Sequence, residues 1–238
     1  MKLGIMQPYF FPYIGYWQLM NAVDKYVVYD DVNYIKGGWI NRNRVLVNGQ
    51  PHYINLPMIG ASPNKIINEI KVNCDLLPKQ KTLRLLEQSY KKAPFFHQTY
   101  ELVERVLTQQ EDNLAKFLML SIQEVKEYLG IQTELIFSSS LPKDNSLKGQ
   151  DKVLSICELL GATEYYNAIG GQELYSFEVF EEGNIALKFV KTEPIFYQQF
   201  GNEFQSNLSI IDVMMFNSKE EIKEMLGKYT LIEGTHND

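Results

Sequence analysis

Hydrophobic and polar positions near the N-terminus follow a pattern that predicts strand, loop, helix and strand. Residues 2–6 form a short apolar run that ends in a turn signal at 7–8, and apolar residues recur at helical spacing over 17–23. Residues 25–31 are rich in β-branched and aromatic side chains, as strands are. Residues 3–31 therefore predict a βαβ unit with a right-handed crossover.

The middle of the chain predicts a hairpin followed by helices. Residues 44–57 read as a β-hairpin that turns at Asn48-Gly49, a dipeptide that accommodates the positive φ angles of a type I′ turn. Residues 78–90 and a longer segment, about 96–129, have the apolar spacing and charge of two amphipathic helices. The segment from about 75 to 130 is therefore expected to be mainly helical.

The last third of the chain returns to alternating strands and helices. Its predicted elements are a strand at 134–141, a polar loop at 143–152 with a candidate phosphate-binding or lid role, a helix at 153–160, strands near 162–171 and 185–190, and a capped helix at 218–226. We expect one domain over residues 1–238. Its predicted class is α/β: a single three-layer, Rossmann-like domain with an N-terminal βαβ unit, a β-hairpin insertion and a helical middle segment.

Composition excludes several classes of protein. Hydrophobic residues make up 45% and charged residues 22%, which is globular rather than disordered, collagen-like or coiled-coil composition. The net charge of −6 argues against a protein that coats nucleic acid. Cys74 and Cys157 lack metal spacing, and no apolar stretch approaches the ~18 residues of a membrane span. We expect a soluble cytoplasmic protein with reduced thiols and no membrane span.

A basic segment stands out in this acidic chain. Residues 32–68 contain no aspartate or glutamate but include Lys36, Arg42 and Arg44. Alternation in an extended segment would put both arginines on one side, with their guanidinium groups available for a diphosphate. The alternatives are an edge strand whose charges prevent unwanted pairing, or salt bridges to the acidic remainder.

Two further candidates lie where the first two strands end. The aromatic loop that starts at Gln7 offers rings that stack on a base or sugar and an amide that reads hydroxyls, although its aromatic residues also suit a core. Asp30 and Asp31 end the second strand on the same predicted edge of the sheet. Because alternation points them to opposite faces, we expect one functional carboxylate, with Asp30 slightly preferred as a base or a ligand for metal or ribose.

Later candidates are weaker. Asp212 is a candidate active-site residue, with Tyr197 and Gln199 on a nearby strand lining the same pocket; the alternative is a helix cap. His52, His97 and His236 share no metal spacing, so a metal site is not expected, and His97 stays a minor acid–base candidate.

Motifs in segments spread over nearly the whole chain form a recognisable set. These segments are Gln7 to Tyr16, Asp24, Asp30-Asp31, Ile40-Asn41-Arg42-Asn43-Arg44, Tyr90 to Pro94, Ile156 to Gly171, Tyr197 with Gln199, and Leu208 to Asp212. Together they resemble the WbqC-like family. Members occur mainly in bacterial gene clusters for O-antigen and other surface polysaccharides, so the resemblance implies a role in making or modifying an activated sugar.

The order strand, proline-containing loop, glycine, helix and strand is also similar to nucleotidylyltransferase-type α/β folds. Those proteins hold ATP phosphates with a His-x-Gly-His loop, where this chain has Tyr13-Ile14-Gly15-Tyr16. A phenol, with a pKa of about 10, stays neutral at pH 7 and supplies no cation. Arg42, Arg44 or Lys148 would have to supply it, and ATP and Mg²⁺ are open cofactor candidates.

Two functions follow as hypotheses. The first is an enzyme acting on a nucleotide-linked sugar by acyl, aminoacyl or nucleotidyl transfer, in which the two arginines hold diphosphate. The second is a non-catalytic sugar-nucleotide-binding or scaffold protein of polysaccharide assembly. The candidate catalytic residues are Asp30, Lys148 and Asp212, and the candidate ligand-binding residues are Gln7, Tyr9, Gly15, Tyr16, Lys36, Asn41, Arg42, Arg44, Tyr197 and Gln199.

Overall fold

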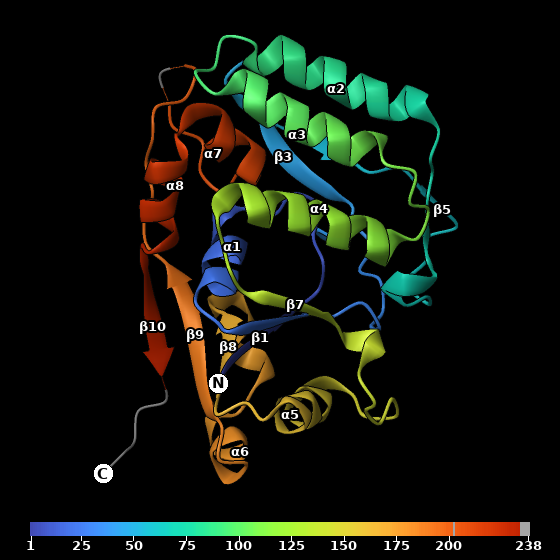
Figure 1. The fold of residues 1–238 in the computed structure, drawn as a ribbon, viewed down its shortest axis with the longest axis vertical. Coiled ribbons are helices and arrows are strands. Elements are labelled where there is room, and N and C mark those ends of the chain that lie inside the picture. Colours follow the sequence, from blue (N-terminus) through green and yellow to red (C-terminus); the bar gives the residue numbers. More distant parts are fainter. Residues whose placement is uncertain (202, 234–238) are drawn as a thin grey trace.

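The computed structural model describes residues 1–201 and 203–233 and is built around a six-stranded sheet (Figure 1). Its strands are β1 (Lys2–Met6), β2 (Lys25–Val28), β7 (Glu134–Phe137), β8 (Glu164–Ala168), β9 (Ala186–Thr192) and β10 (Tyr229–Glu233). They lie in the order β10-β9-β8-β1-β2-β7. β10 runs antiparallel to β9, and the other neighbouring strands of this sheet are parallel. The predicted α/β, Rossmann-like class is confirmed.

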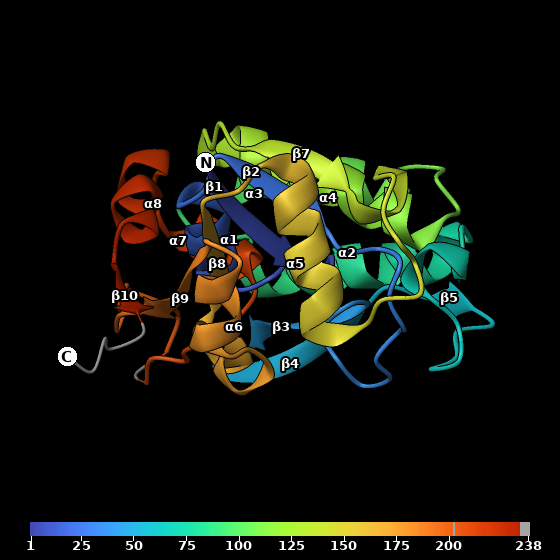
Figure 2. The same cartoon turned by 90° about the horizontal axis from the view of Figure 1, so that it is seen from below.

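Helices cover both faces of this sheet, so the molecule has three layers (Figure 1 and Figure 2). Two hydrophobic clusters, one on each face, hold the layers together. One face carries α1 (Ile14–Asn21), α4 (Leu114–Leu129), α7 (Ile210–Phe216) and α8 (Lys219–Leu226), and the other carries α5 (Gly149–Leu160) and α6 (Phe177–Glu182).

Alternation along the strands explains why both faces are apolar. Leu3 and Ile5 of β1 are buried in the cluster that contains α5 and α6. Between them, Gly4 faces the other way, where a Cβ atom would lie 3.0 Å from the Tyr26 ring. Successive residues of a strand point to opposite faces, so a parallel strand with helices on both sides must be apolar at nearly every position.

The strand order reverses at the middle of the sheet, between β1 and β8. From β1 the chain proceeds to β2 and then β7 in one direction, whereas β8 and β9 lie on the other side of β1. In open α/β sheets, ligands bind outside the carboxyl ends of the strands where the order reverses in this way. The loop that leaves β1 at Gln7 and the end of β8 at Ala168 meet at this point.

The segment between β2 and β7 holds the hairpin and the helical middle. The hairpin pairs β3 (Arg42–Val47) with β4 (Gln50–Asn55), and positive φ angles of 51° at Asn48 and 77° at Gly49 confirm the predicted turn. The other elements here are β5 (Met58–Ile59), the short helix η1 (Ile67–Glu69), β6 (Lys71–Val72), α2 (Leu76–Tyr90) and α3 (Phe96–Thr108).

Two predicted elements are wrong. The long helix expected from about 96 to 129 is two helices, because Asn113 begins α4 as its N-cap and accepts a hydrogen bond from the Lys116 amide. Tyr197 and Gln199 lie in irregular chain after β9 rather than on a strand. The capping box predicted at Ser218 and Glu221 is confirmed at the start of α8.

Candidate functional site

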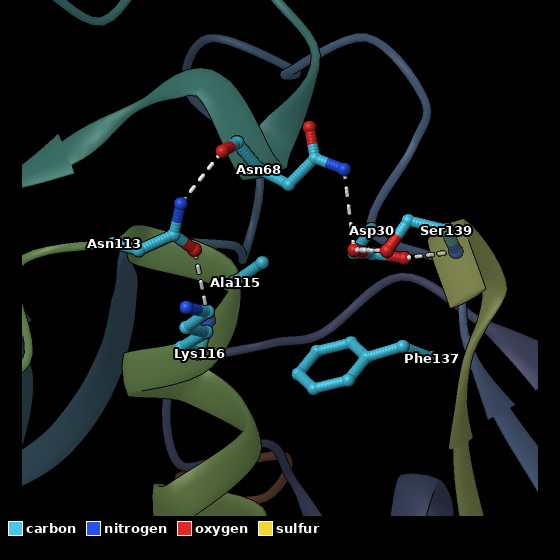
Figure 3. A pocket seen from close by; sticks show the side chains of 7 residues that line it. All are labelled: Asp30, Asn68, Asn113, Ala115, Lys116, Phe137 and Ser139. Atoms are coloured by element: carbon cyan, nitrogen blue, oxygen red, sulfur yellow. Dashed lines mark hydrogen bonds between the residues drawn. The ribbon is translucent and has the colours of Figure 1, made fainter.

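A pocket of about 260 Å³, lined by polar side chains and by apolar surface, lies where β2 and β7 end (Figure 3). η1 and the N-terminal turn of α4 close its other sides. The pocket therefore lies at the carboxyl edge of the sheet, where residues from four separate elements meet. Its lining residues are Asp30, Asn68, Asn113, Ala115, Lys116, Phe137 and Ser139.

Asp30 is the buried acid of this pocket, with an exposure of 2%. Its Oδ1 accepts from the Ser139 amide at 2.9 Å, and its Oδ2 accepts from the Ser139 hydroxyl at 2.6 Å and from Asn68 Nδ2 at 3.3 Å (Figure 3). Ser139 belongs to the short helix η2 (Ser138–Ser140) directly after β7. Three donors from two elements fix the carboxylate and compensate its charge.

The opposite wall of the pocket is the start of α4. Asn113 donates from Nδ2 to the Asn68 carbonyl at 2.7 Å, and its Oδ1 caps the helix (Figure 3). Lys116 is exposed one turn into the helix. Together with the Phe137 ring, these groups give the pocket hydrogen-bond donors, acceptors, one cation and one apolar surface. Such a combination suits a ligand with several hydroxyl groups and a carbon-rich face.

Asp31 lies in a separate network on the α5 side. Its Oδ2 forms ion pairs with Lys143 Nζ at 2.7 Å and Lys152 Nζ at 3.2 Å, and both lysine side chains are nearly buried. Burial by itself raises the pKa of Asp31, but hydrogen bonds from Lys143 and Ser138 and the charge of Lys152 outweigh it and lower the pKa. Asp30 and Asp31 therefore serve different networks, and the second anchors the loop that follows β7.

The loop after β1 packs most of its aromatic residues. The buried Tyr16 hydroxyl donates to the Gln7 carbonyl at 3.2 Å, and its ring centroid lies 5.6 Å from that of Tyr9. Burial, followed by the nearby Tyr13, raises the pKa of Tyr9. A Cβ atom on Gly15 would lie 2.5 Å from the Tyr13 ring, so only glycine admits that ring against α1. Gln7 and Tyr9 are half-buried beside the point where the strand order reverses.

Arg42 and Arg44 lie on one face of the hairpin, and both already have partners. Arg42 donates from Nε to the Gly38 carbonyl at 3.1 Å and from Nη2 to the Gly37 carbonyl. Arg44 donates to the Asn207 carbonyl at 3.3 Å. Two of the five N–H groups of Arg42 are thus used within the chain, and a diphosphate clamp that needs these groups would have to displace the bonds.

Two other members of the basic segment differ in role. Lys36 is exposed. Asn41 ties the segment together, because its Oδ1 accepts from the Tyr34 hydroxyl at 2.8 Å and its Nδ2 donates to the Leu56 carbonyl at 3.3 Å. Asn41 therefore holds the entry to the hairpin in place.

Asp212, Tyr197 and Gln199 do come together, and Tyr90 completes the group. Asp212 Oδ1 accepts from the Tyr90 hydroxyl at 2.6 Å, and Oδ2 accepts from the Tyr197 hydroxyl and from Gln199 Nε2, both at 2.7 Å. Burial raises the pKa of Asp212, although its three donors oppose that rise. Tyr90 also accepts from the Leu46 amide at 2.6 Å. This enclosed network ties α7, α2 and the hairpin together.

The remaining candidates lie apart from the pocket. Lys148 is exposed at the residue before α5, and His52 and His97 are also exposed. His236 lies outside the described residues. Among the residues that the structure describes, no group of three or more His, Cys, Asp or Glu side chains is placed to hold a metal ion. In the same part of the chain, no helix has the length and apolar character that crossing a bilayer requires.

Sequence reasoning found Asp30 but missed its surroundings. Asn68, Asn113 and Ser139 are separated widely along the chain, and only tertiary packing brings them to the same carboxylate and wall. One signal was present at Asn113, because asparagine before the apolar run of α4 is a preferred N-cap. The buried Lys143 and Lys152 were also missed, since lysines in a polar loop are expected to face solvent.

The fold is that of a Rossmann-like α/β protein, with a pocket at the carboxyl edge of its sheet. A family model described as WbqC-like protein family matches residues 7–224, and the chain belongs to this family. It is 27% identical over 229 residues to "Uncharacterized protein Rv1507c" of Mycobacterium tuberculosis (strain ATCC 25618 / H37Rv), covering 94% of this chain and 97% of that protein. No solved structure matches the chain significantly.

Proposed function

We propose that the protein is a cytoplasmic transferase of bacterial surface-polysaccharide biosynthesis that acts on a nucleotide-linked sugar. The observation that carries this proposal is the Asp30 pocket, which combines a held carboxylate with amide, hydroxyl and ammonium groups around one aromatic ring. Hydroxyl groups of a sugar are both donors and acceptors, so a pocket with both kinds of partner suits them.

The reaction that fits this pocket is transfer of an acyl, aminoacyl or nucleotidyl group to a sugar hydroxyl or amine. Asp30 accepts the proton of the attacking group as the new bond to carbonyl carbon or phosphorus forms. The bond to the leaving group of the activated donor breaks, and that group departs with the electron pair. A carboxylate in this role must lie within hydrogen-bond reach of the proton that it accepts, and Asp30 is the carboxylate that lines the pocket.

The nucleotide part of the substrate is supported by the strand order. The order β7-β2-β1-β8-β9-β10 follows the arrangement in which Rossmann-like domains bind nucleotides at the reversal point. The half-buried Gln7 and Tyr9 lie at that point and are the groups proposed to orient the ligand there.

The alternative is a non-catalytic scaffold of the same pathway. The observation on its side is two exposed apolar side chains on separate segments, Phe196 at 74% and Leu174 at 70% exposure. Exposed apolar residues mark a surface for a protein partner where they form a patch. A scaffold would copurify with a glycosyltransferase and would gain no stability from small molecules.

A thermal-shift screen with UDP-, dTDP-, GDP- and CMP-sugars, ATP and Mg²⁺ tests the proposal. A ligand at ~100 times its dissociation constant adds about 2.7 kcal/mol to the free energy of unfolding, which is readily detected. We expect at least one sugar nucleotide to stabilise the wild-type protein and the matched control Glu104→Gln, whose side chain is exposed on α3. Asp30→Asn should fold but lose most of that stabilisation. Absence of stabilisation by any sugar nucleotide would favour the scaffold.

A further inference from the structure

Two stacked aromatic rings, with an arginine at each end of the stack, lie on the exposed face of the β3–β4 hairpin. The Arg42 guanidinium carbon lies 4.6 Å from the centroid of the Tyr53 ring. The Tyr53 and Trp39 rings are stacked, with centroids 6.4 Å apart and planes inclined by 27°. The Arg44 guanidinium carbon lies 5.6 Å from the Trp39 centroid. We call Arg42, Tyr53, Trp39 and Arg44 the hairpin ladder.

The hairpin ladder is accessible and its charges are not neutralised by carboxylates. Trp39 is 38% exposed and Tyr53 is 44% exposed, so both rings present surface to solvent. Among the described residues, neither arginine forms a salt bridge. In the same part of the chain, Arg44 Nε has no hydrogen-bond acceptor, but this atom is buried and out of reach of a ligand. The ladder thus keeps its positive charge, and an anionic ligand would meet the terminal nitrogens of Arg44.

The cations within the ladder have different environments. Arg42 is fixed by two backbone carbonyls, so it mainly supports the Tyr53 ring. Arg44 makes one long bond, from Nη2 to a backbone carbonyl, and its unpartnered Nε is buried. Its guanidinium group is held less tightly within the chain than that of Arg42, so its terminal nitrogens are the better anion partner. The exposed Lys36 lies on the loop that leads to Trp39 and adds positive charge.

Hydrogen bonds join the hairpin ladder to the loop that leaves β1. The Phe10 amide donates to the Trp39 carbonyl at 3.1 Å. Asn43, between the two arginines, donates from Nδ2 to the carbonyls of Phe10 and Phe11 at 3.1 and 2.9 Å. The ladder is thus built against the chain segment that begins at the reversal point of the strand order, where open α/β sheets bind nucleotides.

We propose that the hairpin ladder binds the nucleotide part of the ligand, with the base stacked on Trp39 or Tyr53 and a phosphate held by Arg44. This inference rests on the proposed function for the class of substrate. Base stacking on aromatic side chains is favourable for every base, and guanidinium groups pair well with phosphate. Two rings suit one base, whereas a single-stranded nucleic acid would need a longer basic track than a chain of net charge −6 offers here.

Intrinsic fluorescence reports on this site directly. The chain has two tryptophans, and Trp17 is completely buried while Trp39 is exposed. We expect UDP or ADP to quench the wild-type emission saturably. The quenching should disappear in Trp39→Phe. Calorimetry should show at least tenfold weaker binding in Tyr53→Ala and Arg44→Ala. His52→Ala is the matched control, because His52 is exposed on β4 next to Tyr53 but points to the other face of the hairpin.

Four outcomes would overturn the proposal. These are no quenching by any nucleotide, unchanged affinity in both Tyr53→Ala and Arg44→Ala, equal binding of inorganic pyrophosphate and ADP, and tight binding of oligo-dT in preference to mononucleotides. Asp30→Asn separates this proposal from the proposed function. We expect that variant to keep the UDP response and to lose only the added affinity of a sugar nucleotide. If it retains that affinity as well, the sugar pocket is wrong while the ladder stands.

Discussion

At the scale of single residues, the two neighbouring aspartates show which properties of a site can be predicted from the sequence and which cannot. Their place at a strand end predicted that one carboxylate would be functional and that the two would face apart. The structure gives Asp30 neutral donors beside an open pocket and Asp31 two lysines in a closed network. The partners were not predictable, because Asn68 lies 38 residues and Ser139 109 residues from Asp30 along the chain.

The Asp31 network makes the protein sensitive to acid. Its pKa is lower in the folded protein than its ordinary value of 3.8, so the unfolded chain takes up the proton more readily. The stability from this group is therefore present above pH 3.8 and is lost as the pH falls through the folded-state pKa.

Asp31→Asn should remove this part of the acid dependence. It should also lower the free energy of unfolding at pH 7 by about 3 kcal/mol, because two nearly buried lysines lose their counter-charge. Urea unfolding at pH 7 and at pH 3 measures both effects. An equal loss at the two pH values would show that the ion pairs are not the cause, and Glu104→Gln should match the wild type.

At the scale of elements, local chemistry predicted the hairpin turn and the last helix but not the break in the helical middle. Asn48-Gly49 and the Ser218 capping box are short-range signals that need no tertiary partner. The break before α4 lies between two amphipathic helices, α3 and α4, of similar composition. In the sequence, only the asparagine N-cap of α4 marks this break. That cap lies in the wall of the pocket, so the start of α4 forms part of the pocket wall.

Substitutions at Asn113 should separate its two roles. Asn113→Asp keeps an N-cap acceptor but loses the donor to the Asn68 carbonyl, whereas Asn113→Ala loses both. We expect Asn113→Ala to lower the free energy of unfolding by about 1–2 kcal/mol and Asn113→Asp to lower it by less. Chemical denaturation measures the difference. Equal losses in both variants would mean that the cap contributes little here.

At the scale of the whole molecule, the class of fold was predictable because strand and helix signals alternate from end to end. The order of the strands in the sheet could not be predicted, because it depends on which strands pair across long stretches of chain. The insertion between β2 and β7 is tied to the rest through the Asp212 network, where the Tyr90 hydroxyl accepts from the Leu46 amide and donates to the carboxylate of Asp212 on α7.

These ties predict that the chain unfolds as one unit. Far-UV circular dichroism and tryptophan fluorescence should report the same midpoint in urea, since Trp17 lies in the cluster that also contains the helical middle. Two separate transitions would show that the hairpin and helical middle form an independent unit, contrary to the predicted single domain.

The most direct test of the account is a crystal structure of the protein with the sugar nucleotide that stabilises it most in the thermal-shift screen. We predict sugar hydroxyl groups within hydrogen-bond distance, about 3 Å, of the Asp30 carboxylate and of Asn68 or Asn113. A sugar bound elsewhere, with the Asp30 pocket holding only solvent, would contradict the central claim that this pocket recognises the sugar.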